Sequence, residues 1–122
     1  MLKIISEKRE PTPFELELNG VTHTLMMTQF SVADNFKLVD IQSSFLPKVD
    51  NKGNIDVTPE LTEKLMASRL KVSIKNPDGS MFFTGSVDEI LDTLGAKAVS
   101  LLCYECDKLN PMDLGGLEDK KK

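Results

Sequence analysis

The sequence predicts an α+β fold in which an N-terminal β-hairpin is followed by a small bundle of about four helices. Three observations predict this fold. Residues 14–18 alternate apolar and acidic side chains before an Asn-Gly pair. Residues typical of helix starts recur at Ser31, Thr58 and Ser86. The chain of 122 residues is long enough for one hydrophobic core, so we expect a single domain over residues 1–110.

Composition and charge argue against several classes of protein. Nineteen acidic residues against fifteen basic ones give a net charge of −4, which does not favour the basic surface that nucleic-acid binding requires. The apolar opening Met1 to Ile5 is too short for a signal-peptide core, and no apolar run approaches the roughly 20 residues of a membrane span. We therefore expect a cytoplasmic protein with reduced cysteines and with no nucleic-acid or membrane partner.

The first two strands are predicted from a local pattern. Apolar and acidic residues alternate with period two over Phe14–Leu18, which is typical of a strand with one buried face. Asn19 and Gly20 readily take the two positive φ values of a type I′ turn. Residues 21–27 should therefore return as the second strand of a hairpin.

A helix is predicted over residues 32–46, with Ser31 as its N-cap and Asp34 at the positive end of its dipole. At 100° per residue, its apolar side chains form two stripes on nearly opposite sides. The first stripe comprises Val32, Phe36, Val39 and Leu46, and the second comprises Leu38, Ile41 and Phe45.

Only one of these stripes is needed to dock the helix on the core of its own domain. The other must be covered by another part of the chain or by another molecule. Our hypothesis places a partner or self-association surface at Leu38, Ile41 and Phe45. The alternative is that these three side chains pack under the last two helices, and the sequence leaves both interpretations open.

The middle of the chain is predicted to be a flexible connection followed by a helix. Residues 47–58 are rich in turn-forming residues. Thr58 and Pro59 then supply a hydroxyl cap and a proline at the first helical position. The inward stripe of this helix comprises Leu61, Leu65 and Val72. Beyond it, residues 71–75 also alternate as a strand would, so a second short hairpin near residues 71–84 remains an alternative.

The last part of the domain is predicted to contain two helices. Ser86 and Glu89 form a capping box before a short helix over residues 87–94. Gly95 breaks or kinks the path, and a final helix over 96–109 ends before Asn110-Pro111. The remaining residues 111–122 have no core pattern and are predicted to be a flexible C-terminal tail.

The two cysteines, Cys103 and Cys106, have a spacing that redox enzymes and zinc sites both use. A structural zinc site needs four ligands, and the chain has two cysteines and one histidine in total. Both cysteines share one helical arc with Val99 and Leu102, so we expect buried, unreactive thiols. His23 lies in a hairpin without the partners of a general base. We therefore expect no metal site, no cofactor and no catalytic residues, and thus no enzyme.

With its elements in order, the chain resembles the tail assembly chaperones of long-tailed, siphophage-type bacteriophages. Three segments carry the likeness. The first is a hairpin followed at once by a helix. The second combines an Asp-Gly turn, an aromatic pair and a capped acidic helix start, and the third is a final helix ending in Leu-Asn. In the sequence these segments read FELELNGVTHTLMM, NPDGSMFFTGSVDEIL and LLCYECDKLNP, and together they span about residues 14 to 111.

The resemblance implies a non-enzymatic assembly factor that associates with the tape measure protein and keeps its apolar segments from aggregating. In that family, a longer form made by translational frameshifting recruits tail tube subunits. The resemblance also implies action in the host cell cytoplasm and absence from the mature virion, and the apolar helix faces suggest a homo-oligomer. Competing hypotheses are a small structural tail or head-tail joining component of a phage particle, and a general adaptor.

Overall fold

The structure is a computed structural model that describes residues 1–4, 6–46 and 57–111. Nearly all of the connection predicted at 47–58 and of the tail predicted at 111–122 lies outside these described residues.

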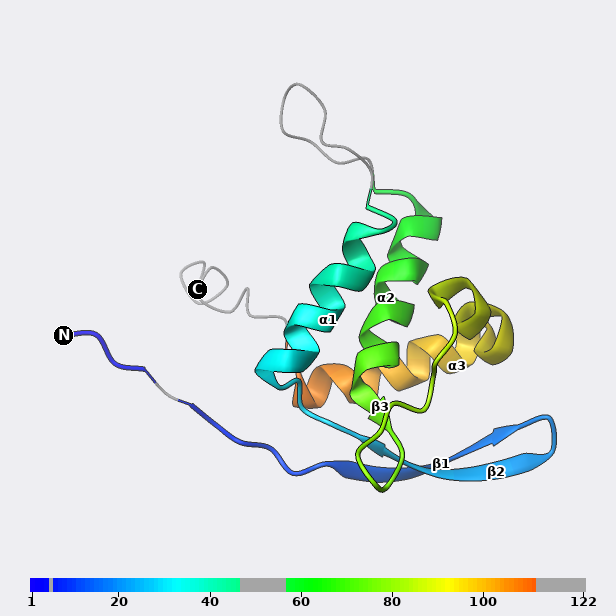
Figure 1. The fold of residues 1–122 in the computed structure, drawn as a ribbon, viewed down its shortest axis with the longest axis horizontal. Helices are drawn as coiled ribbons and strands as arrows, with labels where there is room; N and C mark the ends of the chain where they lie inside the picture. Colours follow the sequence, from blue (N-terminus) through cyan, green and yellow to red (C-terminus); the bar gives the residue numbers. More distant parts are fainter. Residues whose placement is uncertain (5, 47–56, 112–122) are drawn as a thin grey trace.

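Within the described residues the chain has an α+β fold, with a three-stranded antiparallel sheet and three helices (Figure 1). The strands follow the order β1-β2-β3 across the sheet. The elements are β1 Thr12–Leu18, β2 Val21–Met27, α1 Val32–Ser43, α2 Pro59–Ser73, β3 Ile74–Lys75 and α3 Val87–Leu109.

The predicted N-terminal hairpin is confirmed. Strands β1 and β2 pair in antiparallel register, with Phe14 opposite Leu25. The turn residues Asn19 and Gly20 have φ values of 51° and 80°, as a type I′ turn requires. Leu25 and Met27 point to the buried side of the sheet, and the hairpin thus supplies one wall of the core.

The ambiguity at residues 71–84 resolves into a helix end followed by a very short strand. Helix α2 continues to Ser73, and β3 then pairs with β2 through Met27 opposite Ile74. After the turn, Met81 returns to Lys75 through a single bridge. Residues 75–81 therefore close a small loop, but β3 is added to the N-terminal hairpin and does not form a second, independent hairpin.

The predicted bundle of about four helices is wrong. The break or kink predicted at Gly95 is confirmed, because φ is 79° and ψ is 163° there, and the two helical segments on either side of it together make up the element α3. Glycine adopts this positive φ without steric strain, so the chain changes direction without a loop. Figure 1 shows α1 and α2 side by side, whereas α3 runs across α2 instead of alongside it.

Helix α2 lies at the centre of the fold. It packs against both α1 and α3, and Ala67 and Leu70 on its inner side are fully buried. The N-cap predicted at its start is confirmed, because the Thr58 hydroxyl accepts a hydrogen bond from the Leu61 N–H at 3.1 Å. The core cluster comprises Leu25, Met27, Ala67, Leu70, Ile74, Phe83, Val87, Ile90, Val99, Cys103 and Cys106.

Candidate interaction surface

The orientation of α1 is fixed at its first turn by a buried ion pair. Asp34 is only 3% exposed, and its carboxylate receives hydrogen bonds from the Lys75 ammonium at 2.9 and 3.1 Å. The same carboxylate accepts the Ser31 N–H at 3.0 Å, while the Ser31 hydroxyl accepts the Asp34 N–H, which completes a capping box. Burial acts to raise the pKa of Asp34, but the bonds from Ser31 and Lys75 outweigh it and leave the pKa below its usual value.

A second polar joint ties the end of α3 to the chain that leads into α1. The buried Asn110 accepts the Phe30 N–H at 2.6 Å and donates to the Thr28 carbonyl at 3.0 Å. Its own carbonyl accepts a bond of 2.7 Å from the Arg69 guanidinium on α2. Three distant segments therefore meet at one residue, and α1 starts from a fixed point.

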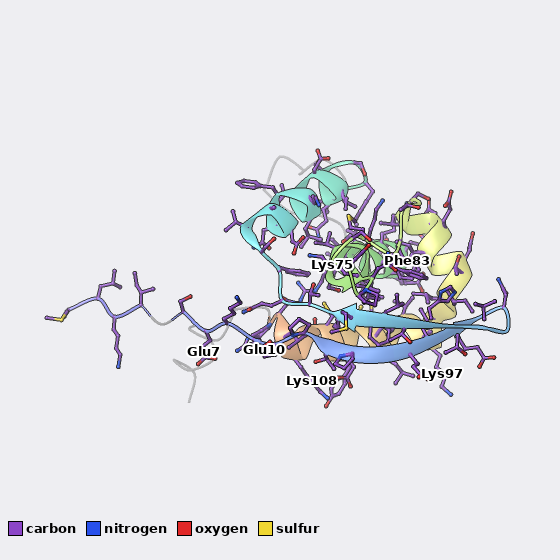
Figure 2. The ribbon with its side chains drawn as sticks, turned by 60° about the horizontal axis from the view of Figure 1, so that its bottom comes forward. Glu7, Glu10, Lys75, Phe83, Lys97 and Lys108 are labelled. Carbon is purple, nitrogen blue, oxygen red and sulfur yellow. The ribbon has the colours of Figure 1, made fainter. Side chains whose placement is uncertain are left out.

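The outer side of α1 carries an exposed apolar ridge, which we call the α1 ridge and define as Val32, Phe36 and Val39. These side chains are 73%, 72% and 65% exposed. They lie at positions i, i+4 and i+7, so they form one continuous strip along the helix. Leu46, which belongs to the same predicted stripe, lies beyond the end of α1 and is 40% exposed. In Figure 2, α1 forms one margin of the molecule, with side chains projecting away from its body.

The inner side of α1 carries the three residues that the sequence suggested as a partner or self-association surface. Leu38 is buried at 9% exposure, while Ile41 and Phe45 are partly buried and pack against the core cluster. Ile41 and Phe45 also line an open groove of about 400 Å³ between α1, α2 and the start of α3. The two side chains therefore keep some access to solvent, and a partner or self-association role for Leu38, Ile41 and Phe45 stays a prediction. The larger exposed apolar surface is the opposite stripe.

The α1 ridge contains no charged side chain. At 100° per residue, Ser43 continues the line of the ridge one turn beyond Val39, while Asn35 borders the ridge on one side and Asp40 on the other. A single exposed apolar residue is ordinary on a protein surface, but a continuous strip without charge is typical of a surface that another molecule covers.

An open pocket of about 360 Å³ adjoins α1 on the Asn35 side. We call it the arginine pocket, because Arg9 and Arg69 line it together with Gln29, Asn35 and the ring of Phe30. Sequence reasoning did not find this pocket. Its two arginines are sixty positions apart, and no local pattern connects them.

The two cysteines are buried in α3, as their helical positions predicted. Cys103 is 5% exposed, Cys106 is fully buried, and both thiols are free. Burial, the neighbouring Cys106 and the charge of Asp107 together raise the pKa of the Cys103 thiol to about 12. Within residues 1–4, 6–46 and 57–111, no group of three or more His, Cys, Asp or Glu residues is arranged to hold a metal ion.

His23 has a structural environment on the inner side of the hairpin. Its ring lies 5.0 Å from the ring of Phe82, which in turn contacts Phe83 edge to face. This stacking packs the segment that follows β3 against strand β2.

None of the helices in the described part of the chain combines the length and the apolarity that crossing a membrane would need. No protein-family model, curated protein or solved structure matches the sequence or its fold.

Proposed function

We propose that this protein is a non-enzymatic tail assembly chaperone of a long-tailed bacteriophage, and that it binds helical segments of the tape measure protein through the α1 ridge. The supporting observation is the exposed, uncharged strip of Val32, Phe36 and Val39 on a helix whose position is fixed by buried polar contacts. A rigid apolar helix face is suited to packing against an amphipathic helix.

The size of the ridge supports transient binding. Full burial of a large apolar side chain contributes roughly 1.5–3 kcal/mol, so three of them give about 5–9 kcal/mol before any cost of association. That cost is itself about 4–15 kcal/mol, so one ridge alone binds weakly. Several copies acting along one long partner bind more firmly together, and each copy still dissociates readily. These magnitudes agree with a homo-oligomeric factor that leaves before the virion is complete.

The proposal extends to the chain that follows Asn110. In this scheme, a longer frameshifted form carries an extension that recruits tail tube subunits in the host cytoplasm. Lys120 to Lys122 are encoded by A-rich codons, and runs of such codons are typical of slippage sites.

Co-expression with a fragment of the tape measure protein tests the ridge directly. The wild-type chain should keep the fragment soluble, and Phe36→Glu should abolish this effect because a charge replaces the centre of the ridge. Leu101→Glu is the matched control: Leu101 is also strongly exposed, but on α3, so this variant should behave as the wild type. The proposal would be contradicted if the Phe36→Glu variant kept the fragment as soluble as the wild type does. It would also be contradicted if the fragment stayed insoluble in the presence of abundant wild-type chain.

The composition of purified virions separates the proposal from its main competitor. A chaperone should be absent from the particles, whereas a structural tail or head-tail joining component should be present in fixed copy number. Quantitative mass spectrometry of purified particles distinguishes the two outcomes.

A further inference from the structure

The wall of the arginine pocket brings two guanidinium groups together. Arg9 and Arg69 are the charged side chains among the described residues that line it, and no carboxylate lines it in that part of the chain. Each arginine also pairs with a carboxylate outside this lining, Arg9 with Glu7 at 3.4 Å and Arg69 with Asp107 at 3.0 Å. The proximity of two guanidinium groups calls for an explanation in terms of either the fold or a ligand.

The fold explains the position of both arginines. Arg9 donates to the Leu109 carbonyl at 3.1 Å, and Arg69 donates to the carbonyl of the next residue, Asn110, at 2.7 Å. Both guanidinium groups therefore converge on the negative end of the α3 dipole. Arg69 is also held in place by the Phe30 ring, whose centroid lies 5.2 Å from the guanidinium carbon.

The fold does not use every N–H donor of the two arginines. A guanidinium has five N–H donors, and the contacts of Arg69 to Asn110 and Asp107 both use the same terminal nitrogen, Nη2. The acidic partners Asp107 and Glu7 have side chains that are 52% and 67% exposed, so these two ion pairs are screened by solvent and are weak. Guanidinium donors thus remain available at the pocket.

The pocket borders the α1 ridge. Asn35 and Leu38 of α1 contribute to its wall. At 100° per residue, Asn35 lies about 60° around the helix from Val32 and about 40° from Val39. A helix that packs on the ridge therefore places the side chains that flank its own apolar stripe over the pocket.

We propose that the arginine pocket binds a carboxylate carried by the segment that docks on the α1 ridge. The preferred partner is thus an amphipathic helix whose apolar stripe is bordered by Asp or Glu. Charge complementarity identifies this partner, since a carboxylate matches the forked donors of a guanidinium. The inference rests on the proposed function, because it takes the ridge as the primary contact.

Three synthetic helical peptides test the inference. They share one leucine stripe and differ only in the residues that flank it, which are Glu, Gln or Lys. Binding to the full chain is measured by isothermal titration calorimetry at low salt. The Glu peptide should bind about tenfold more tightly than the Gln peptide, and the Lys peptide more weakly than both.

A charge introduced into the pocket wall gives the matched variant. Asn35→Asp should reduce the preference for the Glu peptide to about twofold or less, because a carboxylate in the wall repels the one that enters. This variant should fold normally, since an acidic residue near the start of a helix is favourable. Asn35→Ser is the control, and it should keep the preference.

Each outcome separates the two proposals. If the Glu and Gln peptides bind equally and Phe36→Glu abolishes both interactions, the ridge is the contact and the pocket proposal is overturned. If no peptide binds, both proposals are overturned. If Asn35→Asp changes the oligomeric state without peptide, the occupant is a carboxylate of a second copy, which also overturns the inference.

Discussion

Helices α1 and α3 have opposite arrangements of polar and apolar contacts. The inner side of α3 is held by apolar side chains such as Val99 and Cys106, and its outer side mixes Leu101 and Tyr104 with charged residues. The inner side of α1 contains Leu38, but it is also held by polar pairs, namely Asp34 with Lys75 and Gln42 with Ser68. Most of the exposed apolar surface of α1 lies on its outer side.

This contrast shows that the number of exposed apolar side chains does not by itself mark an interaction surface. Tyr104 is 64% exposed, which is close to the value for Val39, but the Lys108 ammonium lies 4.5 Å above its ring and also pairs with Glu105. Figure 2 shows Lys97 and Lys108 on the side of the molecule opposite α1. Charged neighbours keep the α3 surface compatible with water, whereas the α1 ridge has none within it.

A valine-to-aspartate substitution should give the largest difference in stability between the two helices. Val99 is 2% exposed, so Val99→Asp places an unpaired carboxylate in the core and should destabilise the protein by about 4 kcal/mol or more. Val39→Asp on the α1 ridge should change stability by about 0.5 kcal/mol or less. Urea denaturation followed by circular dichroism measures both. A large loss of stability in the Val39 variant would show that the ridge is packed within its own chain.

The buried side of α3 should also protect its cysteines. Because Cys103 and Cys106 are buried and the pKa of Cys103 is raised to about 12, both thiols should react at least about 1000-fold more slowly with a thiol reagent than in the unfolded chain. This factor corresponds to about 4 kcal/mol of protection. The reaction is followed at pH 8 with and without denaturant. Rapid labelling of even one thiol in the native protein would contradict the burial of this stripe.

The ion pair that attaches α1 should contribute less to the free energy of unfolding than the buried side of α3 does, and its contribution should depend on pH. Asp34→Asn leaves the largely buried Lys75 without its charge partner and should destabilise the protein by about 2–3 kcal/mol at pH 7. The pKa of Asp34 is below its usual value of 3.8 in the folded protein. Its contribution is therefore fully present above pH 3.8 and is lost as the pH falls through the folded pKa.

Urea titrations at pH 7 and at pH 3 or below measure this contribution. The difference in the free energy of unfolding between the wild type and the Asp34→Asn variant should be smaller at the acidic pH. Val39→Ala provides a control, because its difference from the wild type should not change with pH. A difference for Asp34→Asn that stays constant from pH 7 to pH 2 would show that the ion pair does not hold α1.

Much of the fold could be predicted because its determinants are local. The positive φ values of Asn19-Gly20, the Thr58 cap and the helical arc of the cysteines each depend on residues close together in sequence. The break at Gly95 likewise follows from a single glycine within an otherwise helical pattern. Such features follow from backbone preferences and periodicity alone.

The candidate surface could not be predicted in the same way, because long-range contacts decide which side of α1 faces inward. Its two apolar stripes are similar in size, and periodicity cannot rank them. The choice is made by Asp34 with Lys75 and by Gln42 with Ser68, which are 41 and 26 positions apart. The arginine pocket depends on partners still further apart, such as Arg9 and Leu109.

The joint at Asn110 has a consequence for the chemical ageing of the protein. Asn110 acts there as both donor and acceptor, so its conversion to aspartate would remove the bonds to Thr28 and Cys106. Asparagine deamidates through attack by the following backbone nitrogen, and here that nitrogen belongs to Pro111 and carries no hydrogen. The succinimide route is therefore closed at the joint, whereas the exposed Asn19-Gly20 turn leaves it open. Stored protein should accumulate its first deamidation in the hairpin turn, far from the joint that positions α1.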